Sequence, residues 1–258
     1  MRGLKTEIYR IVTSRSCKRA FFFLLAMQLL LAKIDAGNII ALGRHDTPET
    51  NPELASVMPT VEYYGFDALA YGIIVLLVFG AVSGAENFKH HELRTAFLYQ
   101  GNRRLLTLYK LAAFLFVATG ISFCAIFTTV SITHFFLGNE GLHPVLLSSI
   151  SWQFILYGVL AWTLLAFLAF LLGLLFKNVA APLLLLIPQV VGLGVVLLHY
   201  WNFGKYLPVA ASYAIYSTPT GMMAHSPLMG TVTLLLWILL LFPSGFRSLS
   251  RQEIGGRY

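Results

Sequence analysis

Long apolar runs separated by short polar segments organise this chain. Crossing the roughly 30 Å hydrocarbon core of a bilayer takes about 20 residues of helix, and four runs reach that length: 66–85, 111–136, 152–176 and 179–201. A fifth run, 227–246, contains glycine and proline, which are common in membrane helices. The pattern predicts an all-α integral membrane protein with a single transmembrane domain over residues 1–258.

The first apolar run is shorter than the others. Residues 20–32 are too few to cross a bilayer, so a span here has to continue through Lys33 and Asp35 to residue 42. A cleaved signal peptide is the alternative, because a basic start and a short apolar core are typical of one. No A-x-A-like cleavage site lies near position 36. We therefore expect a retained span over 20–42, which makes six spans in all.

Basic residues are distributed unevenly between the two sides that six spans define. Of the 18 lysines and arginines, Arg44 and Lys205 fall in segments assigned to the outside and Lys33 falls within a span, while all the others lie in 1–19, 86–110, 177–178 and 247–258. Cytoplasmic loops of membrane proteins carry such an excess. Both termini are therefore expected in the cytoplasm. The net charge of +7 then reflects topology and contact with anionic lipid rather than nucleic-acid binding.

Composition and motifs exclude several classes of protein. Charged residues make up 11% of the chain, against roughly 25% in soluble domains. Cys17 and Cys124 are too few for a disulfide framework and are expected to be free thiols. The single Gly-Lys pair, Gly204-Lys205, lacks the other residues of a nucleotide-binding P-loop. With no H-E-x-x-H motif either, we expect no catalytic site, no metal and no cofactor in this chain.

Residues 1–19 predict an amphipathic helix along the cytoplasmic interface, because Leu4, Ile8, Ile11 and Val12 follow helical spacing. Two interpretations stay open. The helix can be a simple lipid anchor, or it can be an elbow helix that leads into the first span and contacts a cytoplasmic partner.

The longest cytoplasmic segment between spans, 86–110, is the most informative one. Its apolar residues can form one stripe on a helix, while Gly101-Asn102 predicts a turn. A solvated loop that obeys the positive-inside rule is the alternative. The stripe favours a structured element with a partner, and it consists of Phe88, Leu93, Phe97 and Leu98.

This segment resembles the loop after the second span in permease subunits of type-2 ABC transporters, a family that includes bacterial lantibiotic and multidrug exporters. Asn87 stands where the family has Glu, with Glu86 one residue earlier, and His91-Glu92 replaces the usual Gly-Thr. The layout of nearly the whole chain is similar too, with an elbow helix, six spans and a Pro-rich outside segment before the last span. The residues that match the family pattern are Phe88, Lys89, Leu93, Arg94, Leu98, Arg103 or Arg104, and Lys110.

The resemblance implies a coupling helix that sits in a groove of a separate ATPase subunit, which binds ATP and Mg. It also implies two copies of that ATPase and a second permease chain, identical or related, in the bacterial cytoplasmic membrane. The residues expected to couple to the ATPase are Glu86, Phe88, Lys89, Leu93, Arg94, Phe97, Arg103 and Arg104.

Two further features belong to the outer side. Residues 202–226 are too polar and proline-broken for a span, so they form either a re-entrant segment that caps an exit path or an interfacial loop with tyrosines at the headgroup level. Asp35 and Asp67 lie near the outer ends of their spans. They either line an outward substrate path or are simply hydrated.

The predicted interior is mostly apolar, with few fixed charges. It suits an amphipathic or hydrophobic substrate, such as a peptide antibiotic, a drug or a lipid-like molecule, and the resembled family favours export. A membrane anchor or immunity-type protein that acts by binding alone is the alternative function. An ATPase gene next to this one would favour the permease.

Overall fold

The computed structural model describes residues 2–42, 59–88, 102–193, 196–197, 200, 202–218 and 226–250. Within these residues the chain is helical and has no strand, so the prediction of an all-α protein is confirmed for them. The elements in chain order are α1 (Arg2–Thr13), α2 (Arg15–Leu42), η1 (Val61–Tyr63), α3 (Leu69–Glu86), α5 (Arg103–Leu137), η2 (Gly138–Glu140), α6 (Ser149–Phe176), α7 (Ala180–Pro188), η3 (Gln189–Leu193), η4 (Asn202–Tyr206), α9 (Pro208–Tyr216) and α10 (Pro227–Ser250).

Five helices are long and apolar enough to cross a membrane: α2, α3, α5 with its η2 extension, α6 and α10. The first of these, α2, runs without interruption through Lys33 and Asp35 to Leu42. The third, α5, starts well before the apolar run at 111, because the Asn102 side chain caps it by accepting hydrogen bonds from the backbone N–H groups of Arg104 (3.1 Å) and Leu105 (3.3 Å). Residues 103–110 of the predicted loop therefore belong to this helix.

The apolar run at 179–201 is described only in part, and its predicted span is not confirmed. The described part of this run contains one short apolar helix, Ala180–Leu193, in which α7 is followed by the π-helical turn η3. Pro188 has no N–H to donate, and Gly192 has a φ of 126°, which residues with a side chain rarely adopt. The described residues thus contain five helices of spanning length, where the sequence predicted six.

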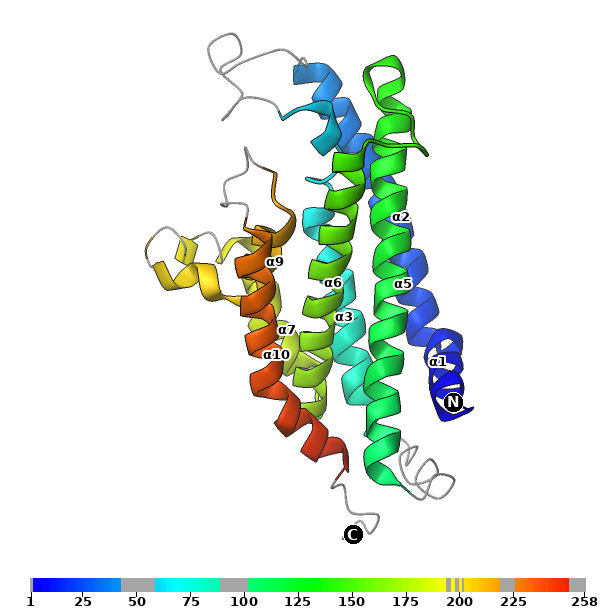
Figure 1. Cartoon of the computed structure of the whole chain (residues 1–258), viewed down its shortest axis with the longest axis vertical. Coiled ribbons are helices and arrows are strands. Elements are labelled where there is room, and N and C mark those ends of the chain that lie inside the picture. The colour runs from blue at the N-terminus through cyan, green and yellow to red at the C-terminus, as the bar shows by residue number, and fades with distance from the viewer. Residues whose placement is uncertain are drawn as a thin grey trace.

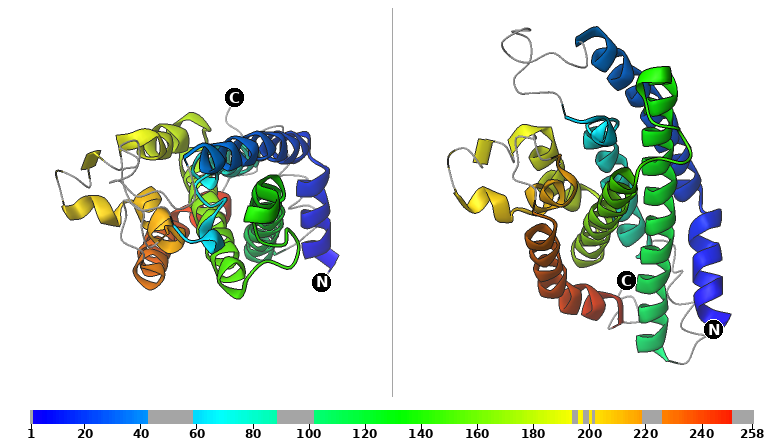
Figure 2. Two further views of the ribbon diagram at one scale, coloured as in Figure 1. Left: turned by 90° about the horizontal axis from the view of Figure 1, so that it is seen from above. Right: turned by 45° about the horizontal axis from the view of Figure 1, so that its top comes forward.

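The central helix of the bundle is α6. In its most apolar window 78% of the residues are buried, against 22% for α2 and 28% for α10. Seen from above, α2 and α10 lie on opposite sides of α6 (Figure 2). Against α6, α3 packs at very short range, because a Cβ atom on Gly80 or Gly84 would collide with the backbone carbonyls of Ala166 and Phe170.

The ends of the long helices lie at two opposite ends of the bundle. α1, the end of α3, the start of α5 and the end of α10 all lie at the lower end in Figure 1. We call this the basic end, because Arg10, Arg103, Arg104, Lys177 and Arg247 belong to it. The end of α2 and the turn between α5 and α6 lie at the opposite end (Figure 1).

Candidate functional site

The amphipathic helix predicted at the N-terminus is present as α1, and it packs mainly against α5. Ile8 and Ile11 contact the hydrophobic core, while Val12 is 47% exposed. Glu7 has no place in an apolar stripe, yet it is only 6% exposed. The buried face of α1 therefore carries a carboxylate, which requires partners from other helices.

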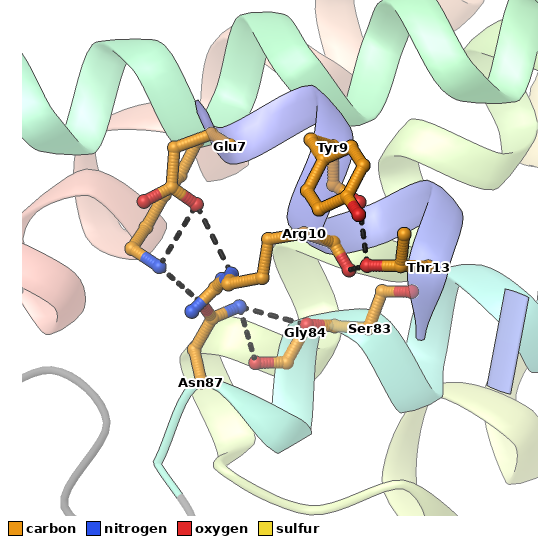
Figure 3. Close-up of polar contacts among 8 residues, drawn as sticks. Glu7, Tyr9, Arg10, Thr13, Ser83, Gly84 and Asn87 are labelled. Carbon is orange, nitrogen blue, oxygen red and sulfur yellow. Dashed lines mark hydrogen bonds and ion pairs between the residues drawn. The ribbon is translucent and has the colours of Figure 1, made fainter. Parts of the chain in front are cut away.

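Those partners form a cluster of four side chains at the basic end, which we call the polar cluster: Glu7, Arg10, Asn87 and Lys110. Nζ of Lys110 lies 3.3 Å from Oε2 of Glu7 and donates a hydrogen bond of 3.2 Å to Oδ1 of Asn87. Nε of Arg10 lies 3.2 Å from the same Glu7 oxygen, and Nη2 of Arg10 donates to Oδ1 of Asn87 over 3.3 Å. Figure 3 shows Glu7, Arg10 and Asn87 pointing toward one another.

Asn87 owes its orientation to the end of α3. Its Nδ2 group donates to the carbonyls of Ser83 (2.7 Å) and Gly84 (3.4 Å), which the helix end leaves without a backbone donor (Figure 3). This directs Oδ1 toward the two cations of the polar cluster. An ionised carboxylate at this position could pair with Lys110 but could not donate to those carbonyls.

Lys110 is the most constrained member of the polar cluster, because its side chain is only 2% exposed. An unpaired ammonium at such a site costs several kcal/mol, whereas a paired and hydrogen-bonded one is tolerated. Lys110 therefore needs Glu7 nearby, and this need holds α1 against α5. A second polar contact joins α2 to α3, where Oγ of Ser16 donates to Oε1 of Glu86 over 2.7 Å.

The predicted coupling residues fall into three groups. Glu86 and Phe88 lie at and just beyond the end of α3, and Arg103 and Arg104 form the exposed first turn of α5. Phe88 packs against the core, and Nζ of Lys177 lies 5.2 Å from its ring centroid, so its ring faces the bundle and the α6–α7 turn. The remaining four, Lys89, Leu93, Arg94 and Phe97, lie outside the described residues.

At the opposite end, the two predicted substrate-path aspartates belong to different segments, with Asp35 in α2 and Asp67 just before α3. Asp67 is exposed, while Asp35 accepts a hydrogen bond from the backbone of Gly65. Among the described residues, Oδ2 of Asp35 is buried without a hydrogen-bond partner. Deeper in the bundle, Oγ1 of Thr129 donates to Oε1 of Gln28 over 3.0 Å, so the interior carries polar groups that the hydropathy pattern did not reveal.

The described residues contain no group of three or more His, Cys, Asp or Glu side chains placed to hold a metal ion. Their two cysteines are free thiols, with Cys17 buried and Cys124 exposed. No protein-family model, curated protein or solved structure matches the chain. Ion pairs and hydrogen bonds between helices hold the polar cluster together.

In the family pattern Lys110 is a matching position and Asn87 is a departure, while Glu7 and Arg10 have no part in it. The sequence does indicate that Lys110 needs an anionic partner, because a lysine at the start of a long apolar run is costly to bury without one. Nothing in the sequence indicates which anion that is, since Glu7 is 103 positions away.

Proposed function

We propose that this chain is the membrane-spanning permease subunit of an ATP-driven exporter of the type-2 ABC class. The polar cluster carries the proposal. Its contacts fix α1, the end of α3 and α5 against one another, where residues 89–101 leave the bundle and about two helical turns after they rejoin it. A segment held in this way at both ends can pass a movement on to two spanning helices, because a buried polar network resists gradual deformation.

In this proposal the chain crosses the bacterial cytoplasmic membrane six times, with both termini inside. The region 179–201 supplies the fifth crossing, and residues 202–226 form a re-entrant or interfacial segment on the outside. The shared position of α1 and the end of α10 supports an even number of crossings (Figure 1). The collection of cations at that end supports its cytoplasmic location.

The proposed complex contains two copies of a separate ATPase, which bind ATP and Mg, and a second permease chain. Residues 86–104 contact the ATPase. Arg103 and Arg104 suit such a contact because both are exposed at the basic end. Phe88 has a different part in the proposal. Since its ring packs against the core under Lys177, it braces the base of the coupling segment rather than reaching the partner.

We propose an amphipathic or hydrophobic substrate, such as a peptide antibiotic, a drug or a lipid-like molecule, which moves outward. The buried Gln28–Thr129 pair and the buried carboxylate oxygen of Asp35 give the interior a few polar positions in apolar surroundings. Such a lining can hold both the polar and the apolar parts of an amphipathic molecule.

The test is co-purification with the ATPase subunit of the proposed complex, together with substrate-stimulated ATP hydrolysis in lipid. Arg94→Glu and Phe97→Ala should each weaken association by roughly 30-fold, the factor that about 2 kcal/mol at an interface hot spot gives. Both variants should remain folded, because they leave all four side chains of the polar cluster unchanged.

The matched controls are Lys205→Glu and Phe203→Ala, which make the same kinds of change in η4. Phe203 is 81% exposed, so its truncation should leave folding and association unchanged. Normal association and normal stimulated hydrolysis in both loop variants would contradict the proposal. The segment would then be a solvated connector, and a membrane anchor or immunity-type protein acting by binding would be the better description.

A further inference from the structure

A long apolar groove runs between α2 and α3 near the basic end. Its volume is about 450 Å³. The two helices run antiparallel, so the start of α2 faces the end of α3, and the Ser16–Glu86 hydrogen bond closes the groove there. The apolar lining consists of Ala20, Phe23, Ile74, Val75, Val78, Phe79 and Val82, with Ser16 and Arg19 at the closed end.

The closed end of this groove is strongly basic. Arg15, Lys18 and Arg19 are all exposed, and their i, i+3, i+4 spacing places them on one face of α2. Arg19 belongs to the lining itself, and its guanidinium forms no ion pair or hydrogen bond with any residue that the structure describes. The Glu86 carboxylate at this end already accepts the Ser16 hydroxyl.

A second groove offers an internal comparison. It lies along α10 beside η4, has a volume of about 520 Å³, and is lined by Tyr206, Leu228, Met229, Val232, Thr233, Leu236, Trp237 and Leu240. Both grooves are apolar and open. The lining of the second groove contains no lysine or arginine. A lipid in that groove is therefore held by its acyl chain and not by the charge of its headgroup.

We propose that the groove between α2 and α3 is a binding site for an anionic phospholipid of the leaflet at the basic end. One acyl chain lies along the apolar lining, and the phosphate pairs with Arg19, with Arg15 and Lys18 close by. Each lysine or arginine near an anionic headgroup contributes about 1 kcal/mol of attraction. A zwitterionic headgroup carries a cation of its own, which the three basic side chains repel. It therefore loses most of that attraction.

A helix of a second chain is a poorer occupant of this groove. Its apolar side chains would cover Arg19 without offering an anion, and an unpaired charge in an apolar contact is costly. A phospholipid supplies the anion and the chain in one molecule. The site would tie the start of α2 to the membrane surface whether or not the chain transports anything.

The experiment is native mass spectrometry of the full-length protein in detergent, titrated with phosphatidylglycerol or with phosphatidylcholine carrying the same acyl chains. We expect tighter binding of phosphatidylglycerol, and we expect Arg19→Gln to weaken it about fivefold, the factor that about 1 kcal/mol gives. Lys33→Gln removes an exposed cation from the far half of the same helix and should leave the affinity unchanged.

Filling each groove tests the position of the lipid. Val78→Trp should abolish the binding site that prefers phosphatidylglycerol. Val232→Trp should abolish only a site that has equal affinity for phosphatidylglycerol and phosphatidylcholine. Equal affinities in the wild type, or an unchanged preference in Arg19→Gln, would overturn the proposal. A change of oligomeric mass in Val78→Trp would also overturn it, because the groove would then be a contact between chains. If Val78→Trp fails to fold, Arg19→Gln decides alone, since it alters an exposed side chain.

Discussion

Nζ of Lys110 lies 3.3 Å from Oε2 of Glu7, so a lysine in α5 and a carboxylate in the N-terminal helix form a nearly buried ion pair. Asn87 and Arg10 complete its surroundings. The four side chains come from three helices that meet at the basic end. A pair of this kind is a poor source of stability in itself, but removing one partner leaves a charge that the site cannot accommodate.

The first prediction concerns this asymmetry. Glu7→Gln replaces the carboxylate that lies 3.3 Å from Nζ of Lys110 with a neutral amide, so it should lower the free energy of unfolding by about 3 kcal/mol. Lys110→Met should cost less, because Arg10 still neutralises Glu7. The measurement is thermal unfolding in detergent, followed by tryptophan fluorescence.

The double variant Glu7→Gln/Lys110→Met should recover part of the loss, since both buried charges are then absent. Glu140→Gln is the control, because Glu140 is exposed in η2 at the other end of α5. Equal melting temperatures for Glu7→Gln and Glu140→Gln would show that the ion pair contributes nothing to stability.

A second prediction moves the anion to another helix. Asn87→Glu places a carboxylate where Oδ1 of Asn87 now accepts from Lys110 and Arg10. In the Glu7→Gln background this change should restore at least half of the lost stability. Full restoration is not expected, because glutamate cannot donate to the carbonyls of Ser83 and Gly84 as the amide does.

Alone, Asn87→Glu should be close to neutral or mildly destabilising, because it places two carboxylates around the same two cations. The check is a full cycle of melting temperatures for the wild type, the two single variants and the double variant. Additive effects in that cycle would mean that positions 7 and 87 do not share Lys110.

A third prediction tests the close packing of α3 on α6. Gly84→Ala places a methyl group against the backbone carbonyl of Phe170, which cannot move without displacing α6. Overpacking of this kind costs about 1–3 kcal/mol, so the melting temperature should fall and aggregation should rise. Gly120→Ala is the matched control, because a Cβ atom there meets nothing within 4 Å.

The control substitution should be neutral or slightly stabilising, since alanine favours a helix over glycine. Measuring both variants by thermal unfolding and by size-exclusion chromatography separates a packing effect from a general effect of replacing glycine. Similar behaviour of the two variants would refute the close contact between α3 and α6.

A fourth prediction concerns orientation. In a background that carries Cys17→Ala and Cys124→Ser, single cysteines at Thr50 and Glu140 should react with a membrane-impermeant maleimide added to intact cells. Cysteines at Gln100 and Gln252 should react only after permeabilisation, because the positive-inside rule places the basic end in the cytoplasm. Removing Cys124 matters, since that thiol is exposed in the structure. Labelling of position 100 from outside would reverse the orientation.

Much of the helical layout follows from the apolar runs. Four of the predicted spans and the first, shorter run coincide with helices of spanning length, because a segment in a bilayer has to satisfy its backbone groups internally. The span predicted at 179–201 stays a prediction, because no helix of spanning length lies in its described part. Gly192, with a φ of 126°, puts a kink in the helical path at a place that hydropathy does not register.

The start of α5 does not coincide with the start of its apolar run. The sequence predicted a turn at Gly101-Asn102 and, from hydropathy, a span that starts at 111. The amide of Asn102 caps a helix that begins at once, so α5 extends well beyond its apolar part. Local hydrogen bonding thus sets the start of this helix.

Sequence by itself determined the all-helical class, the number of long apolar segments apart from 179–201, and the amphipathic nature of α1, because these depend on periodicity and local composition. Only the tertiary structure decided which buried carboxylate meets Lys110, which glycines allow α3 to touch α6, and that a groove lies beside Arg19. Each of these depends on side chains from different helices. Their distances are set by how the helices pack, and no pattern along a single helix contains that information.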